Sequence, residues 1–165
     1  MTPVAAPDTI PGRFLQTVAE RGGQIALREK VGDAVRTLTY DDWADRTTRV
    51  AAGLRALGVG PGDRVVMLVS NRPEFHVADV AVLLLGATPI SIYNSSSPDQ
   101  IAYLAGHAEA CVAIVEDAQF LARVQEVRGQ LPSLQHLIDC KKPIADQQQP
   151  MINPPYDEKN SRAMP

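Results

Sequence analysis

A short run of apolar residues with no polar alternation constrains the fold most. It is Val65-Val-Met-Leu-Val69, and a second strand pattern lies at residues 88–93. Between them, Ser70-Asn-Arg-Pro73 marks the start of a helix over residues 75–85. Strands that are apolar at every position are typical of parallel sheets, whose neighbouring strands must be joined by a crossover such as a helix. The spacing therefore predicts a parallel strand, helix, strand unit.

The same alternation repeats further along the chain. Ser97-Pro98-x-Gln100 is a capping box that predicts a helix ending at about His107. A strand at residues 111–115, a helix capped by Asp117 and a fourth strand at residues 134–138 follow. Alternating elements of this kind predict an α/β fold, here an incomplete doubly wound and largely parallel sheet.

A helix, a β-hairpin and a longer helix precede the sheet. Residues 14–21 have a helical pattern, and residues 24–29 and 35–39 have strand patterns around a turn at 31–33. An amphipathic helix is predicted over residues 41–57. Thr39 and Asp42 form a capping box at its start, and Gly58 provides a left-handed stop.

Composition excludes several classes of partner. The 165 residues carry a formal net charge of −3 and no Lys/Arg-rich run in the first 140, so we expect no nucleic-acid or anionic-membrane partner. The longest apolar run, residues 80–93, contains Gly86 and Pro89 and is too short for a transmembrane segment.

No secretory signal is predicted, so the expected location is cytoplasmic. Cys111 and Cys140 suit neither a disulfide framework nor a zinc site.

The chain divides into three parts. Residues 1–9 are predicted to be a flexible N-terminus and residues 10–140 a single partial domain. Residues 141–165 contain several prolines and the run Gln147-Gln-Gln149, with almost no apolar periodicity. Such a segment cannot bury enough apolar surface to offset its ordering entropy, so we expect a disordered tail.

Three loops have features of ligand-binding loops. Gly58-Val-Gly-Pro-Gly62 lies between a helix and a strand, the reverse of the order that a phosphate loop requires, and is interpreted as a turn. Ser70-Asn-Arg72 has the right order but no glycine, so a helix cap is favoured over an anion site. Ser95-Ser-Ser97 follows a strand and could contact a ligand at the carboxyl edge of the sheet, although capping by Ser97 explains much of it.

The remaining reactive side chains form no recognisable site. His76, His107 and His136 lack the spacing of paired metal ligands and have no neighbouring nucleophile motif. Asp41-Asp42 is interpreted as a favourable helix start and Trp43 as a core residue. The residues themselves therefore predict no catalytic, cofactor-binding or metal-binding position.

Several segments, taken in their order and spacing, resemble the start of the acyl-adenylate-forming enzymes. The loop Ile92-Tyr-Asn-Ser-Ser-Ser-Pro98 is similar to that of bacterial long-chain fatty acyl-CoA synthetases. The other similar segments are Leu38-Thr-Tyr40, Leu54-Arg-Ala-Leu-Gly-Val-Gly-Pro-Gly-Asp-Arg-Val65, Ser70-Asn-Arg-Pro-Glu-Phe75, Gly86-Ala-Thr-Pro-Ile90 and Ala110-Cys-Val-Ala-Ile-Val-Glu-Asp117.

The resemblance implies a reaction but gives this chain no catalytic residue. The family joins a carboxylate to ATP with Mg²⁺ and then transfers the acyl group to CoA. Its glycine-rich ATP loop, its ribose-binding Asp and its late Lys have no counterpart here, and Lys30 is the one lysine before residue 141. No cofactor site is therefore expected within the chain.

Two functions remain open at this point. The first is a truncated long-chain fatty-acid-CoA ligase, inactive on its own, in which the resemblance ends at Ile138 because of a shifted reading frame or an early stop. The second is a small α/β interaction module that docks onto the complementary remainder of the ligase or onto another protein.

Overall fold

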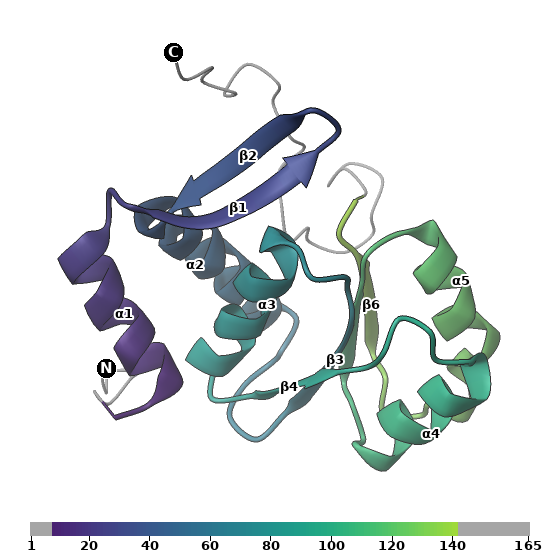
Figure 1. Cartoon of the computed structure of the whole chain (residues 1–165). Coiled ribbons are helices and arrows are strands. Elements are labelled where there is room, and N and C mark those ends of the chain that lie inside the picture. Colours follow the sequence, from purple (N-terminus) through teal and green to yellow (C-terminus); the bar gives the residue numbers. More distant parts are fainter. Residues whose placement is uncertain (1–7, 142–165) are drawn as a thin grey trace.

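A computed structural model of the chain describes residues 8–141. Its centre is a four-stranded parallel sheet with the strand order β4-β3-β5-β6, flanked by helices (Figure 1). The strands are β3 (Arg64–Leu68), β4 (Thr88–Ser91), β5 (Val112–Val115) and β6 (His136–Asp139). The predicted α/β fold with a parallel sheet is confirmed.

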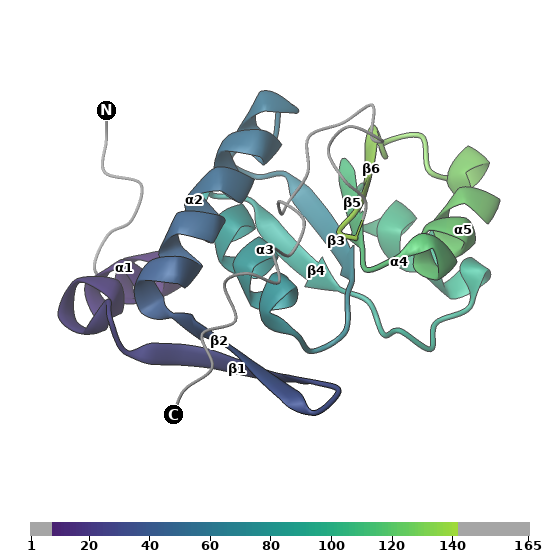
Figure 2. The ribbon, with the colours of Figure 1, turned by 90° about the horizontal axis from the view of Figure 1, so that it is seen from above.

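The two faces of the sheet pack into two separate cores. On β3, Val65 and Met67 belong to the first core and Val66 and Leu68 to the second, as the alternation of strand side chains requires. Helices α2 (Tyr40–Ala56) and α3 (Pro73–Leu84) contribute to the first core, and α4 (Pro98–His107) and α5 (Ala118–Glu126) to the second (Figure 2).

The N-terminal helix and hairpin lie on the side of the first core. Helix α1 (Ile10–Arg21) and strands β1 (Ile25–Val31) and β2 (Ala34–Thr39) contact α2 and α3 (Figure 1). Phe14 meets Trp43 edge to face at 4.8 Å, and Trp43 packs against the first core, as predicted. Helix α1 begins before residue 14 because the Thr9 side chain accepts a hydrogen bond from the Gly12 amide.

The predicted caps of α2, α4 and α5 are present, whereas α3 begins without the side-chain cap hydrogen bond favoured for the loop at residues 70–72. Thr39 and Asp42 form a reciprocal capping box on α2, and Ser97 and Gln100 form one on α4. Asp117 accepts hydrogen bonds from the first amides of α5. Gly58 follows α2 with a φ of 92°, a conformation that favours glycine. These local signals fix where the helices begin and end.

Some expectations fall outside or at the margin of the described residues. The flexible N-terminus and the disordered tail lie largely outside them, although Lys141 is described and forms ion pairs. A short 3₁₀ helix, η1 (Arg128–Gln130), lies between α5 and β6. Within residues 8–141, no helix combines the length and apolar character needed to cross a membrane.

Candidate functional site

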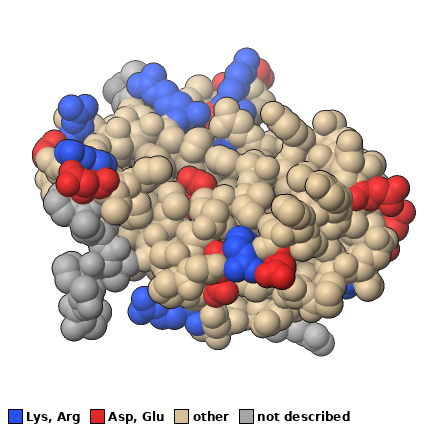
Figure 3. All heavy atoms as spheres, turned by 90° about the horizontal axis from the view of Figure 1, so that it is seen from below, with Lys and Arg blue, Asp and Glu red and all other residues tan. Residues whose placement is uncertain are grey.

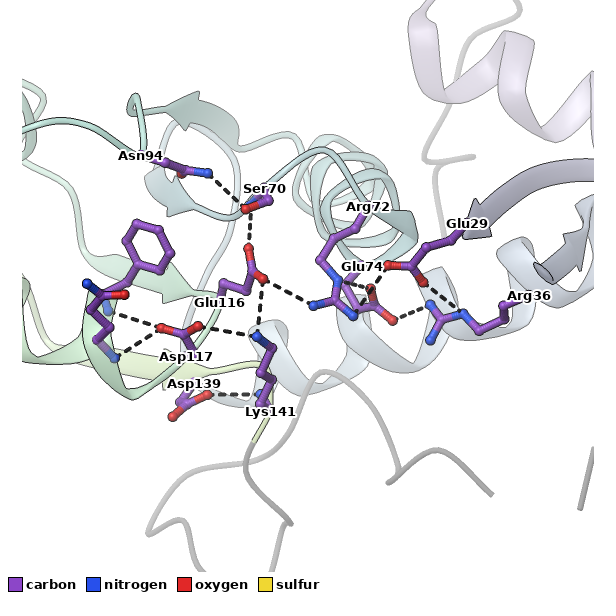
Figure 4. Close-up of polar contacts among 12 residues, drawn as sticks. Glu29, Arg36, Ser70, Arg72, Glu74, Asn94, Glu116, Asp117, Asp139 and Lys141 are labelled. Carbon is purple, nitrogen blue, oxygen red and sulfur yellow. Dashed lines mark hydrogen bonds and ion pairs between the residues drawn. The ribbon is translucent and has the colours of Figure 1, made fainter. Parts of the chain in front are cut away.

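The carboxyl edge of the sheet carries a group of polar side chains. Ser70 follows β3, Asn94 follows β4, and Glu116 and Asp117 follow β5, while Lys141 follows β6 (Figure 4). Parallel strands present their carboxyl ends at one edge, and ligands of open α/β sheets bind there. This edge is therefore the candidate functional site.

Glu116 lies at the centre of the group. Its carboxylate accepts hydrogen bonds from the Ser70 amide at 2.8 Å, from Arg72 Nη1 at 3.2 Å and from Lys141 Nζ at 3.2 Å (Figure 4). Burial alone would raise the pKa of Glu116, but the hydrogen bonds from Ser70 and the hydrogen bond and charge of Lys141 outweigh it, and the pKa lies at about 2. The side chain is therefore ionised at neutral pH.

A second carboxylate connects this edge to the hairpin. Glu74, in the first turn of α3, binds Arg72 Nε at 2.7 Å and also pairs with Arg36 of β2. Glu29 of β1 lies 3.3 Å from Arg36 Nε and 3.6 Å from Arg72 Nη2. Burial would raise the pKa of Glu74, but the Arg36 and Arg72 pairs lower it overall.

These contacts form one charged cluster, which we call the carboxyl-edge network. Lys141 completes it by binding Asp117 at 3.2 Å as well as Glu116. Each cation of the network already faces at least one carboxylate, so it presents no spare positive charge to a phosphate. The members of the network are Glu29, Arg36, Arg72, Glu74, Glu116, Asp117 and Lys141.

A cleft of about 360 Å³ lies beside the network, between β1 and the start of α3. Arg28 and Lys30 line it on the hairpin side, and Asn71 and His76 line the helix side. His76 Nε2 lies 3.2 Å from Asn71 Oδ1, and the imidazole packs edge to face against Trp43. The polar lining suits water or a small polar ligand better than an acyl chain.

The loops singled out from the sequence have structural partners. The Ser70 amide and Arg72, considered above as an anion site, bind the protein's own Glu116. In the neighbouring loop, Asn94 Nδ2 donates to Ser70 Oγ at 3.0 Å and Ser97 caps α4. The structure thus brings the two loops together. The first binds an internal carboxylate and does not cap α3 through a side chain, whereas the second caps α4.

The other candidates lie away from the carboxyl edge or take structural roles. Residues Gly58–Gly62 form the turn that enters β3 from its amino end, where Asp63 accepts a hydrogen bond from the Gly60 amide. His107 stacks on Tyr103. Burial raises the pKa of the Cys140 thiol to about 12, which makes it a poor nucleophile. Across residues 8–141, no group of metal-binding side chains comes together.

Sequence reasoning missed most of the carboxyl-edge network. Glu29 and Arg36 read as ordinary hairpin residues, and Lys141 was assigned to the tail. A usable signal was present, since Ser70, Glu116 and Asp139 each stand within two residues of the end of a predicted parallel strand.

Comparison with known proteins identifies the family. The profile of the family described as AMP-binding enzyme matches residues 14–163. The chain belongs to the AMP-binding enzyme family. The match continues past Ile138, where we expected the resemblance to end. The residues that follow Ile138 are therefore part of the matched segment, and that expectation is wrong.

Relatives in this family differ greatly in length. An uncharacterized protein of Mycobacterium tuberculosis, Rv1549, is 38% identical over 125 residues, which cover 76% of this chain and 70% of that protein. A long-chain-fatty-acid–CoA ligase of Thermus thermophilus is also 38% identical, over 127 residues that cover 76% of this chain and 23% of that ligase. The chain therefore spans about a quarter of the length of that ligase.

Solved structures agree with the fold. The anthranilate CoA ligase AuaEII, solved with anthranoyl-AMP, matches with a TM-score of 0.71 and 26% identity over 78% of this chain and 24% of that one. The N-terminal domain of FACL13 from Mycobacterium tuberculosis matches with a TM-score of 0.72 and 23% identity, over 80% of this chain and 34% of that one. The chain corresponds to the N-terminal portion of an AMP-binding enzyme.

Proposed function

We propose that this chain supplies the first part of a long-chain-fatty-acid–CoA ligase. The observation that carries the proposal is the 38% identity to the Thermus thermophilus ligase over 127 residues. Further long-chain-fatty-acid–CoA ligases of Xenopus laevis and Mycobacterium bovis match at 30% and 33% identity. Fatty acid is thus the substrate class that the named relatives favour.

The chain alone is proposed to be inactive in acyl adenylation. Adenylation requires positive charge or a metal at the polyphosphate, and the motifs that provide it in the family have no counterpart in these 165 residues. The arginines of the carboxyl edge cannot substitute, because Arg36 and Arg72 are committed to Glu29, Glu74 and Glu116. Catalysis then depends on the complementary remainder of the ligase.

Carboxylate-dependent exchange of pyrophosphate into ATP tests this proposal. We expect the purified chain to show no exchange above a buffer blank with any fatty acid. Coexpressed with the part of the Thermus thermophilus ligase that follows the matched segment, it should restore exchange with a long-chain fatty acid. A benzoate panel is the control for specificity, since a hydroxybenzoate–CoA ligase of Thauera aromatica is 35% identical. Exchange by the chain alone would refute the assignment.

A small interaction module is the second candidate. Rv1549 favours it, because the match covers 70% of that protein and so shows a family member of comparable length. As such a module, the chain would dock onto the complementary remainder of the ligase or onto another protein without taking part in adenylation. Gel filtration with and without the complementary ligase part, followed by the exchange assay on the eluted complex, separates the two, because only the first proposal requires a complex that gains exchange activity.

The cytoplasm is the proposed compartment. Cys111 and Cys140 are free thiols in the structure, and free thiols suit a reducing environment. A nucleic-acid partner is not proposed, because the chain carries a formal charge of −3.

A further inference from the structure

Helix α4 has apolar side chains on two faces, although only one face is needed for the sheet. Ile101 and Ala105 point into the second core and are buried. Tyr103 and Leu104 lie outside that core and are 69% and 39% exposed. An ordinary surface helix has one apolar stripe and an opposite polar face. The second apolar face of α4 is therefore a candidate binding surface.

The exposed residues form a groove with the preceding loop. Tyr93, which directly follows Ile92 of the second core, is 85% exposed, and it lines one side of a groove of about 440 Å³. Contiguous exposed apolar surface of this kind marks interaction sites. Seen from below, broad areas of the molecular surface carry no charged side chains (Figure 3). The groove is lined by Tyr93, Ser96, Asp99, Gln100, Tyr103 and Leu104.

The backbone that carries these side chains is held in place from several directions. The capping box of Ser97 and Gln100 fixes the start of α4. Asn94 donates to Ser70 Oγ, and its carbonyl oxygen accepts a hydrogen bond from Arg123 Nη1 at 2.6 Å. The ring of Tyr103 stacks on His107 at 5.9 Å. Aromatic anchors on a fixed backbone lose little entropy on binding, so the groove is preorganised for a partner.

The fraction of the family covered by this chain indicates what the partner is. The matched segment is 23% of the Thermus thermophilus ligase and 24% of the anthranilate CoA ligase chain. A unit taken from a larger domain exposes apolar surface where the rest of that domain packs. The groove residue Tyr93 comes shortly after β4 in the chain. Strand β4 is an edge strand of the described sheet, and an edge strand can pair with or pack against another segment.

From these observations we infer that the groove between Tyr93 and Tyr103 is the docking surface for the remainder of the AMP-binding ligase. This inference rests on the proposed function above and adds where the two parts meet. The surface that fits is mainly apolar, since Tyr93, Tyr103 and Leu104 dominate the lining. It should carry an N–H donor or a cation opposite Asp99, which is the one charged side chain that residues 8–141 contribute to the lining.

Other exposed apolar residues provide a matched control. Val31 and Val35 are 55% and 61% exposed, but they lie on the hairpin, far from α4 in the fold (Figure 1). They do not line the groove. Substitution of Val35 by Ser removes a comparably exposed apolar side chain without touching the proposed surface.

Copurification tests the inference. The tagged full chain is coexpressed with the part of the Thermus thermophilus ligase beyond the matched segment, and the amount of that part recovered is measured. We expect Tyr93→Ser with Tyr103→Ser to reduce recovery at least about tenfold, as loss of central aromatic anchors does, whereas Val35→Ser leaves it unchanged. Equal recovery with the double variant overturns the docking surface while the proposed function stands. No recovery with the unsubstituted chain overturns both.

A second measurement avoids dependence on the folding of the variants. The unsubstituted chain is treated with a tyrosine-nitrating reagent, alone and in the copurified complex, and modified peptides are identified by mass spectrometry. Tyr93 and Tyr103 should react in the free chain and be protected severalfold in the complex. Reaction at the same rate in both states contradicts the inference.

Discussion

The two faces of the sheet are covered to different depths. On the side of the first core, α2 and α3 cover the strands, and α1 and the hairpin lie against these helices in turn. On the side of the second core, the shorter helices α4 and α5 cover the strands, and α4 turns Tyr103 outward. The comparison teaches that the two faces of one parallel sheet can be covered to different depths, by helices backed by a further layer on one side and by a single layer of helices on the other.

Substitutions within β3 compare the two cores directly and should have the largest effect. Met67 and Leu68 are adjacent, fully buried and directed to opposite faces. Met67→Ala and Leu68→Ala should each lower the free energy of unfolding by about 2–5 kcal/mol, because each leaves a cavity in a packed core. Urea unfolding followed by circular dichroism measures both. A cost below 1 kcal/mol for Leu68→Ala alone would show that the second core is loosely packed without its partner.

Loss of the central carboxylate tests how much the carboxyl edge contributes. Glu116→Gln removes the charge opposite Arg72 and Lys141 and should cost about 1–3 kcal/mol at pH 7. The folded pKa of about 2 lies below the ordinary 4.5, so the contribution is fully present above pH 4.5 and is lost as pH falls toward 2. Unfolding of both proteins at pH 7 and pH 3 measures this. A difference that does not shrink at the lower pH would contradict the role of the charge.

The two capping boxes offer a smaller, matched comparison. Thr39→Ala frees an amide at the start of α2, and Ser97→Ala does the same for α4. Each should cost about 1 kcal/mol. Thermal unfolding gives the loss for both, with Thr48→Ala, an exposed position within α2, as control. A much larger loss for Ser97→Ala would mean that the loop carrying Tyr93 depends on this cap.

The smallest effect is expected on the outer face of α4. Tyr103→Ser in the isolated chain should change the free energy of unfolding by no more than about 0.5 kcal/mol, apart from the lost helix propensity, because the side chain is mostly exposed. Urea unfolding of the chain without its partner is the measurement. A loss of 2 kcal/mol or more would place Tyr103 in the fold of this chain and remove the contrast between the two sides.

Local sequence signals predicted the elements of the fold well. The capping boxes at Thr39 and Ser97 and the stop at Gly58 lie where the helices begin and end, because each depends on neighbouring residues. The apolar run beginning at Val65 became the central strand β3, since burial on both faces leaves no position for polar residues. The last strand is displaced to His136–Asp139 from the predicted 134–138.

The carboxyl-edge network could not be predicted because its members are distant in sequence. Glu29 and Arg72 meet only after the hairpin packs beside α3, and Glu116 meets Lys141 only after β5 and β6 pair. Nothing in the residues around Arg72 shows which carboxylate it faces, so its loop favours a helix cap over an anion site and gives no sign of an internal ion-pair network. The apolar outer face of α4 was equally hidden until the buried positions were known.

The side chains at the two ends of the carboxyl-edge network differ in solvent exposure, so the two ends should respond differently to ionic strength. The side chains of Arg36 and Glu74, which join the hairpin to α3, are only 15% and 9% exposed, so dissolved ions cannot approach them closely. Lys141, at the opposite end, is 48% exposed and lies within reach of counterions. Added salt should therefore loosen the attachment after β6 well before it affects the hairpin, so that a single continuous cluster behaves as two electrostatic units.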